Sequence, residues 1–95
     1  MNFFIILIAI NVIVFQITYP LDLASFQSIR QFAEKINLNH AKIDVLINNA
    51  GVSVPLKQNM RTKENFDINF GVNHLGHFLL TNLILQKIKD AAPSR

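Results

Sequence analysis

A chain of 95 residues has room for one small domain, or for about half of a nucleotide-binding doubly wound fold with its six or so strands. Hydrophobic residues make up 51% and charged residues 16%, which argues against an intrinsically disordered chain. The net charge of +3 comes from scattered basic residues, so nucleic-acid binding is not expected. The sequence contains no cysteine, which excludes disulfides, thiol nucleophiles and zinc–thiolate sites.

The N-terminal stretch Met1–Phe15 is almost continuously apolar. It is short for a membrane-spanning helix, which needs about 20 apolar residues, and it lacks the basic start and cleavage site of a secretory signal. A buried strand or helix is one interpretation, and a membrane-associated segment is the other. We expect an intracellular protein, either membrane-associated through this stretch or cytoplasmic. Residues 1–17 are treated as an apolar segment of unclear role and residues 18–95 as the domain.

A strand, a helix and a second strand are predicted next. The β-branched and aromatic run Val12–Tyr19 indicates a strand that ends at Pro20, because proline cannot donate to a ladder. Ser25 is placed to cap a helix that ends near Asn37–His40, with apolar positions at Phe26, Ile29, Phe32, Ala33 and Ile36. The apolar run Ile43–Ile47 predicts a strand buried in a parallel sheet. This order is that of a right-handed βαβ unit.

The strand predicted at 43–47 ends in a narrow turn, Asn48-Asn49-Ala50-Gly51. Asn and Gly tolerate tight backbone geometry, and ligands of open α/β sheets bind at the carboxyl ends of the strands. Taken alone, these residues are either an ordinary turn or the wall of a ligand site. A loop, Val52–Asn65, follows.

A long helix is predicted from Glu64 to about Ala92. Its expected apolar face holds Phe66, Phe70, Leu75, Leu79, Leu83 and Ile88. Gly71 and Gly76 are unfavourable inside a helix, so they indicate close packing or a break near residues 72–73. His74 and His77 have a spacing that metals can use, but no third ligand is apparent, so no metal site is expected.

Five segments in this order resemble the middle of a short-chain dehydrogenase/reductase, in particular the retinol dehydrogenase-like branch. The segments are Leu21–Ser25, Ser28–Arg30, Asp44–Gly51, Gly71–Asn82 and Ala92–Arg95. The resemblance covers about residues 19–95. It implies the α/β class, as an incomplete Rossmann-type doubly wound parallel sheet with the element order β-α-β-α.

The resemblance also implies roles for individual residues. The Asp22 carboxylate would accept from the adenine amino group of NADP(H) or NAD(H), with Leu23 beside it. The four residues of the turn, Asn48, Asn49, Ala50 and Gly51, would line the cofactor. Asn73 would be the catalytic asparagine of an Asn-Ser-Tyr-Lys tetrad, distorting its helix and holding a water that relays protons to the lysine.

Two motifs of the family are missing from this sequence. The glycine-rich turn Thr-Gly-x-x-x-Gly-x-Gly does not occur, and Tyr19 is followed four residues later by Leu23 instead of the lysine of Tyr-x-x-x-Lys. Ser94 does not correspond to the catalytic serine. We therefore expect a fragment of an oxidoreductase acting on a lipophilic alcohol or carbonyl, inactive by itself. The alternative is a non-enzymatic truncated product that binds a partner or a membrane through its apolar N-terminus. Open strand edges also favour self-association.

Overall fold

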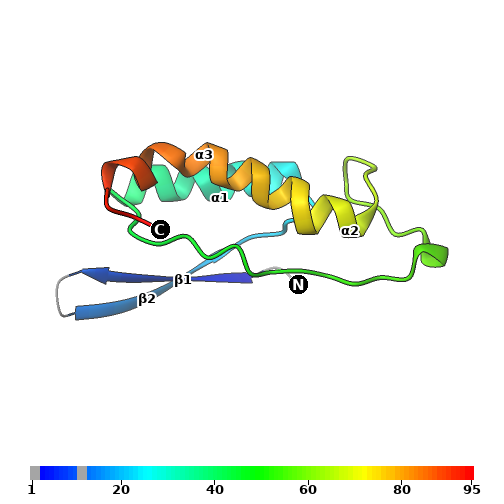
Figure 1. Cartoon of the computed structure of the whole chain (residues 1–95), viewed down its shortest axis with the longest axis horizontal. Helices are drawn as coiled ribbons and strands as arrows, with labels where there is room; N and C mark the ends of the chain where they lie inside the picture. The colour runs from blue at the N-terminus through cyan, green and yellow to red at the C-terminus, as the bar shows by residue number, and fades with distance from the viewer. Residues whose placement is uncertain (1–2, 11–12) are drawn as a thin grey trace.

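The computed structural model describes residues 3–10 and 13–95, with side chains from Ile17 onward. It is elongated, with extents of 48 × 21 × 21 Å (Figure 1). In chain order, the strands and helices are β1 (Phe3–Ile10), β2 (Ile13–Pro20), α1 (Phe26–Asn39), the 3₁₀ turn η1 (Leu56–Gln58), α2 (Ile68–Phe70), the π-helical segment η2 (Gly71–Gly76) and α3 (His77–Asp90).

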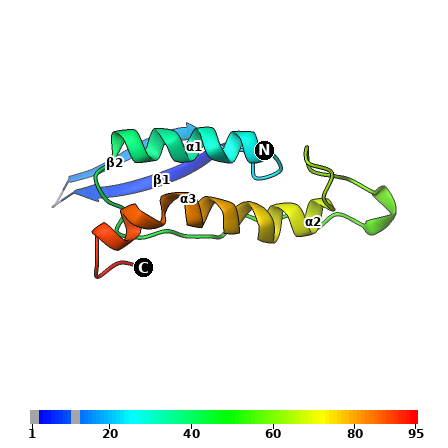
Figure 2. The same ribbon diagram turned by 90° about the horizontal axis from the view of Figure 1, so that it is seen from above.

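The elements form two layers, which Figures 1 and 2 show from two sides. Helices α1 and α3 pack against each other in one layer. The other layer contains the hairpin of β1 and β2 and an extended segment, residues 42–54. The core between the layers is apolar and contains Leu21, Leu23, Ile29, Phe32, Ala33, Ile36, Ile68, Val72, Leu80 and Ile84.

Helix α1 confirms the prediction made from its capping and spacing. The Ser25 side chain accepts a hydrogen bond from the Ser28 N–H at 3.2 Å, so it satisfies one of the free amides of the first turn. The buried residues of the helix are Ile29, Phe32, Ala33 and Ile36. At the other end, the His40 N–H donates to the Ile36 carbonyl oxygen and closes the last turn.

The strand predicted at 12–19 is confirmed as β2 for its described part, from Ile13, and Pro20 is its last residue. The pairing differs from the prediction, because β2 pairs with β1 in an antiparallel hairpin with Phe3 opposite Pro20 and Ile10 opposite Ile13. Val12 lies outside the described residues. The prediction of membrane association through residues 1–15 rests on side chains that the structure does not describe.

The prediction of a buried parallel strand at 43–47 is wrong for this structure. The segment is extended, but no ladder joins it to β2. Its backbone bonds go to the C-terminal part of the chain: the Ile43 N–H donates to the Lys87 carbonyl oxygen at 3.0 Å, and the Leu46 N–H donates to that of Arg95 at 2.7 Å. A strand needs a partner backbone, and the partner in this structure is not the predicted one.

Apolar side chains of this extended segment are open to solvent as a result. Val45 is 55% exposed and Ile47 67%, whereas Ile43 and Leu46 are half-buried against the core. The half-buried positions are three residues apart, so they do not follow the two-residue period of a regular strand with one covered face. The βαβ order is therefore replaced by hairpin, helix, extended segment and helix within the described part of the chain.

The long C-terminal helix runs without interruption from Ile68 to Asp90 and begins four residues later than predicted. Asp67 caps it, with Oδ2 accepting from the Phe70 N–H at 3.2 Å. The sequence left close packing or a break open near residues 72–73, and the structure has no break there but a π-helical segment, η2. Apart from Gly71, the buried positions fall at every fourth residue, namely Ile68, Val72, Gly76, Leu80 and Ile84.

The predicted apolar face is wrong at its start, since Phe66 is 41% exposed and Phe70 52%. Four residues of an ordinary α-helix turn through about 40° more than one full turn, so positions spaced four apart move gradually around the helix. The wider π turn compensates for this drift and gives a spacing of four.

The two helical glycines confirm the predicted close packing. A Cβ atom on Gly76 would lie 2.7 Å from the Leu23 carbonyl oxygen, and one on Gly71 would collide with the Thr62 Cγ2 atom. Both glycines are buried. Gly76 lets the helix approach the turn before α1, and Gly71 lets it approach the loop at Thr62, more closely than any other residue would allow.

Candidate cofactor-lining site

One face of the long helix carries a row of four polar side chains, Asn69, Asn73, His77 and Thr81. We call this row the side-chain ladder. It faces the extended segment, and its members contact Val54, Val52, Ala50 and Asn48 in turn. The helix therefore advances four residues for every two residues of the extended segment, in the opposite direction.

The two asparagines of the ladder bind the backbone of the extended segment at two points each. Asn73 Oδ1 accepts from the Val52 N–H at 2.8 Å, and its Nδ2 donates to the Val52 carbonyl oxygen at 2.8 Å. Asn69 does the same with Val54, at 2.8 and 2.9 Å. A carboxamide offers a donor and an acceptor side by side, as the N–H and C=O of one residue in a neighbouring antiparallel strand do.

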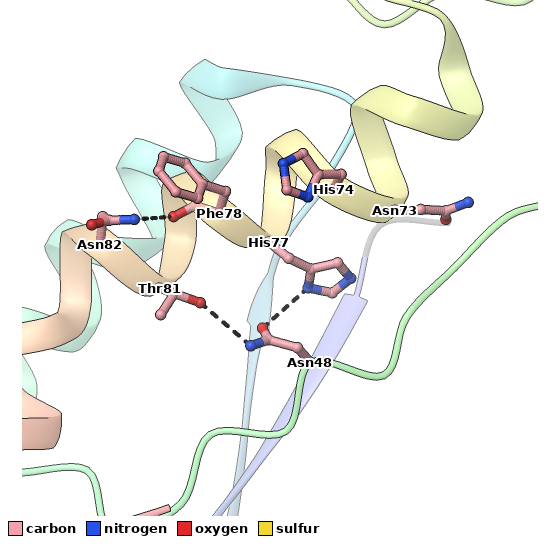
Figure 3. A pocket seen from close by; sticks show the side chains of 7 residues that line it. All are labelled: Asn48, Asn73, His74, His77, Phe78, Thr81 and Asn82. Carbon is pink, nitrogen blue, oxygen red and sulfur yellow. Dashed lines mark hydrogen bonds between the residues drawn. The ribbon is translucent and has the colours of Figure 1, made fainter.

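His77 and Thr81 continue the ladder onto the predicted cofactor-lining turn (Figure 3). His77 Nε2 lies 2.7 Å from the Ala50 carbonyl oxygen, and its Nδ1 lies 3.2 Å from Asn48 Oδ1. The Asn48 Nδ2 lies 3.4 Å from the Thr81 hydroxyl oxygen. Two helix residues therefore fix both the backbone and the side chain of the turn.

Simple geometry explains why this match works. Four residues of helix rise about 6 Å, and two residues of an extended chain span about 6.6 Å. The π turn at η2 holds the ladder on one line, for the same reason that it holds the buried positions on one line. The helix thus provides a straight row of donors and acceptors with the repeat of a strand.

An open pocket of about 350 Å³ lies beside the ladder. Figure 3 shows the residues that line it, which are Asn48, Asn73, His74, His77, Phe78, Thr81 and Asn82. The His74 ring packs between Phe70 and Phe78, at centroid distances of 5.4 and 6.1 Å. Amide, hydroxyl and imidazole groups around an exposed aromatic ring suit a ligand with both polar and flat apolar parts.

Of the other predicted site residues, Leu23 and Gly51 lie against the same stretch of helix. The Leu23 backbone packs on Gly76, three residues after Asn73. Asp22, half-buried before α1, accepts from the Ala24 N–H through Oδ1 at 2.9 Å. Gly51 lies against the side chain of Asn73, where an added Cβ would be 3.2 Å from Oδ1. Asn49 is exposed in the turn.

The residues present fit one wall of a dinucleotide site. The turn is small, exposed and held from behind by the ladder, so a ligand has access to its backbone. A pyrophosphate cradle needs glycines in a loop before a helix. Gly71 and Gly76 are instead buried inside a helix, so they do not supply it. Among the residues that the structure describes, no group of three or more His, Asp or Glu is arranged to hold a metal ion.

Comparisons with known proteins identify the family of the chain. The family model for short chain dehydrogenases matches residues 11–94, which is most of the chain. The chain belongs to the short-chain dehydrogenase family. The family fold confirms the expected class, an incomplete Rossmann-type α/β domain, although the order of elements within the chain differs from the expected one.

Relatives within the family include human retinol dehydrogenase 13, 57% identical over 75 residues that cover 79% of this chain and 22% of the relative. Human retinol dehydrogenase 14 is 51% identical over 80 residues, covering 83% and 23%. Human polyprenol dehydrogenase is 49% identical over 70 residues, covering 74% and 21%. The chain therefore spans less than a quarter of the length of these relatives.

A solved structure is also similar, that of an uncharacterised protein from Mycobacterium paratuberculosis. It superposes with a TM-score of 0.60 and 46% sequence identity, covering 70% of this chain and 23% of that one. None of the helices described here has the length and apolar character needed to cross a membrane.

Sequence reasoning missed three residues of the ladder, Asn69, His77 and Thr81, as contacts of the extended segment. A signal was available, because polar residues at 69, 73, 77 and 81 repeat with a period of four directly after the buried positions. An ordinary helical period of 3.6 distributes these residues around the helix, so the row becomes visible only when the π turn is included.

Proposed function

We propose that this chain is part of an NAD(P)(H)-dependent oxidoreductase that interconverts a lipophilic alcohol and its carbonyl compound. It contributes one wall of the cofactor site and the catalytic asparagine. The observation that carries the proposal is that Asn73 binds Val52, directly after the turn, and His77 contacts Ala50 within it. Membership of the family and the names of the retinol dehydrogenase relatives support the reaction class and a retinoid-like substrate.

In this proposal, the turn Asn48–Gly51 lies against the cofactor and Asp22 accepts from the adenine amino group. A carboxylate has about four lone-pair sites, so the bond from Ala24 to Asp22 Oδ1 leaves capacity for a second donor. Leu23 lies on Gly76 and so keeps this adenine side at a fixed distance from Asn73. The cofactor supplies the hydride, and the protein supplies position and electrostatics.

Asn73 has the environment that a catalytic asparagine needs. It lies inside the π-helical segment, and such segments often occur at functional sites. Its side chain is fixed by Val52 on one side, while the residue itself is exposed at the pocket. We propose that it helps to hold the water through which protons reach the family's lysine. Because Tyr-x-x-x-Lys is not among these 95 residues, we expect no turnover by this chain alone.

A chimeric enzyme tests the proposal. The 75 residues of human retinol dehydrogenase 13 that match this chain are replaced by those of this chain, at 57% identity. We expect NADP(H)-dependent conversion of retinol and retinal to persist in the chimera. The Asn73→Ala change in this chimera is expected to lower kcat at saturating cofactor by at least about a hundredfold, and to weaken cofactor binding as well, because Asn73 also holds the residue that follows the cofactor-lining turn. The matched control is Asn82→Ala, whose side chain bonds only within its own helix.

Two outcomes contradict the proposal. A folded chimera that binds neither NADPH nor NADH shows that these residues do not form a cofactor-lining wall. Equal kcat values for the Asn73→Ala and Asn82→Ala chimeras show that Asn73 has no catalytic role. Turnover by the isolated chain of 95 residues contradicts the expectation that it is inactive by itself.

A further inference from the structure

The contacts of His77 pose a hydrogen-bonding question. Nε2 faces the Ala50 carbonyl oxygen at 2.7 Å, and Nδ1 faces Asn48 Oδ1 at 3.2 Å. Both partners are acceptors, so both contacts are hydrogen bonds only when each ring nitrogen carries a proton. In the neutral ring, Nε2–H donates to Ala50, and Nδ1 becomes an acceptor that faces another acceptor.

Rotation of the Asn48 amide resolves this conflict. After the rotation, Asn48 Nδ2 donates to His77 Nδ1, and Oδ1 faces the Thr81 hydroxyl. The hydroxyl donates or accepts as required, so it satisfies the amide in either orientation. The bond from Nε2–H to the Ala50 carbonyl oxygen is the same in both states.

We propose that His77 is a positioning residue that holds the turn at Asn48–Ala50 in both protonation states, and that the orientation of the Asn48 amide follows the charge of the ring. The charged ring holds Oδ1 toward itself, and the neutral ring holds Nδ2. The proposal deepens the proposed function and rests on it for the role of the turn as a cofactor-lining wall. The hydrogen-bond unit itself is a property of the cofactor-free chain.

The lining of the pocket is compatible with either orientation of the Asn48 amide. Besides His77, the pocket is lined by three asparagines, Thr81, Phe78 and His74, so His74 is the other titratable group in the lining. No carboxylate or basic chain lines this pocket in the described part of the protein. A carboxylate at position 48 would accept in every state and favour the charged ring, whereas an amide next to a hydroxyl adapts to either state.

Nuclear magnetic resonance of the whole 95-residue chain, labelled with ¹⁵N and without cofactor, tests the proposal between pH 5 and pH 8. We expect the Asn48 side-chain amide to shift with the same midpoint as the His77 ring nitrogens. The His77 Nε2–H should remain bonded at both ends of the range. An Asn48 amide that does not respond to the titration of His77 overturns the coupling.

Variants separate positioning from simple packing. Gln at position 77 retains a donor for Ala50 but does not titrate, so His77→Gln should preserve the Gly51 and Val52 resonances and abolish the pH dependence at Asn48. His77→Ala should shift the Gly51 and Val52 resonances and also abolish the pH dependence at Asn48. It should increase hydrogen exchange of the Val52 amide about tenfold, which is the effect of one lost hydrogen bond. If His77→Ala does not fold, His77→Gln still decides the question.

His74→Ala is the matched control, because His74 lines the same pocket and contacts two phenyl rings instead of the turn. It should leave the pH profile at Asn48 unchanged. If His74→Ala abolishes the pH dependence of the Asn48 amide and His77→Gln does not, the assignment to His77 is wrong. Failure of the chimeric enzyme to bind NADPH contradicts the proposed function alone, because the resonance experiment contains no cofactor.

Discussion

Asn73 binds Val52 through both polar atoms of its side chain, each at 2.8 Å. The bond joins the middle of the π-helical segment to the residue directly after the turn at 48–51. The neighbouring contacts between the extended segment and the helix depend on this register, because Ala50 and Val54 lie two residues to either side. The asparagine is thus a structural residue in this chain, in addition to the catalytic role proposed for it.

Removal of the Asn73 side chain should destabilise the fold. Asn73→Ala leaves the N–H and carbonyl oxygen of Val52 without their partner, and we expect the free energy of unfolding to fall by about 1–2 kcal/mol. Asn73→Asp keeps the acceptor but places a second oxygen near the Val52 carbonyl, so it should not rescue the loss. Urea unfolding followed by circular dichroism measures this. Asn82→Ala is the control, and an equal midpoint for both Ala variants contradicts the prediction.

The two helical glycines should respond differently to a change in Thr62. Gly71→Ala and Gly76→Ala should each lower stability by about 1–3 kcal/mol, more than the gain of about 1 kcal/mol in helix propensity. The obstacle at Gly71 is the Thr62 Cγ2 atom, and at Gly76 it is the Leu23 carbonyl oxygen. Thr62→Ser removes that methyl group and keeps the hydroxyl that accepts from Phe66.

A double-mutant cycle in urea therefore distinguishes the two sites. Thr62→Ser should restore most of the stability lost in Gly71→Ala and none of that lost in Gly76→Ala. Equal rescue of both variants, or of neither, shows that the close approach of the helix has another cause.

The cap of α1 should contribute measurably to stability. Ser25 is buried, with 1% of its surface exposed, so water does not readily replace its bond to the Ser28 N–H. Ser25→Ala should cost about 1 kcal/mol. Thermal unfolding monitored at the helical circular dichroism band measures this, with Ser53→Ala as an exposed control in the extended segment. A smaller effect at position 25 than at position 53 contradicts the assignment of the cap.

Exposed apolar residues on the extended segment should promote self-association. Ile47 is 67% exposed, and Ile47→Lys should shift the chain toward the monomer in sedimentation velocity without loss of helix. Ile43 is half-buried against the core, so Ile43→Thr should lower stability instead. A wild-type chain that remains monomeric over a wide concentration range contradicts the predicted self-association.

Helix α1 was predictable because its signals are local. Ser25 and the apolar positions behind it lie within one helix, and the helix that they indicate satisfies almost all of its own backbone groups. The sites of close packing at Gly71 and Gly76 were also predictable, because glycine inside a helix is unfavourable unless a neighbour approaches.

The extended segment was not predictable in the same way. An apolar run such as Ile43–Ile47 indicates a capacity for burial between strands, but the partner of a strand is set by distant parts of the chain. In the structure, the partner of β2 is β1, and residues 43–46 bond to Lys87 and Arg95 instead. The role of His77 was hidden for a related reason, since its neighbours Asn48 and Ala50 are 29 and 27 residues away.

The pairing of Asn69 and Asn73 with alternate residues has a consequence for insertions and deletions. Loss of Ser53 alone would turn the later side chains of the extended segment to the opposite face. The backbone N–H and carbonyl oxygen that Asn69 binds would then point away from it. Loss of two residues there would keep the faces but leave one turn of the helix without a partner. Chain length in the extended segment and in the helix can therefore change only in step, by two residues for about four.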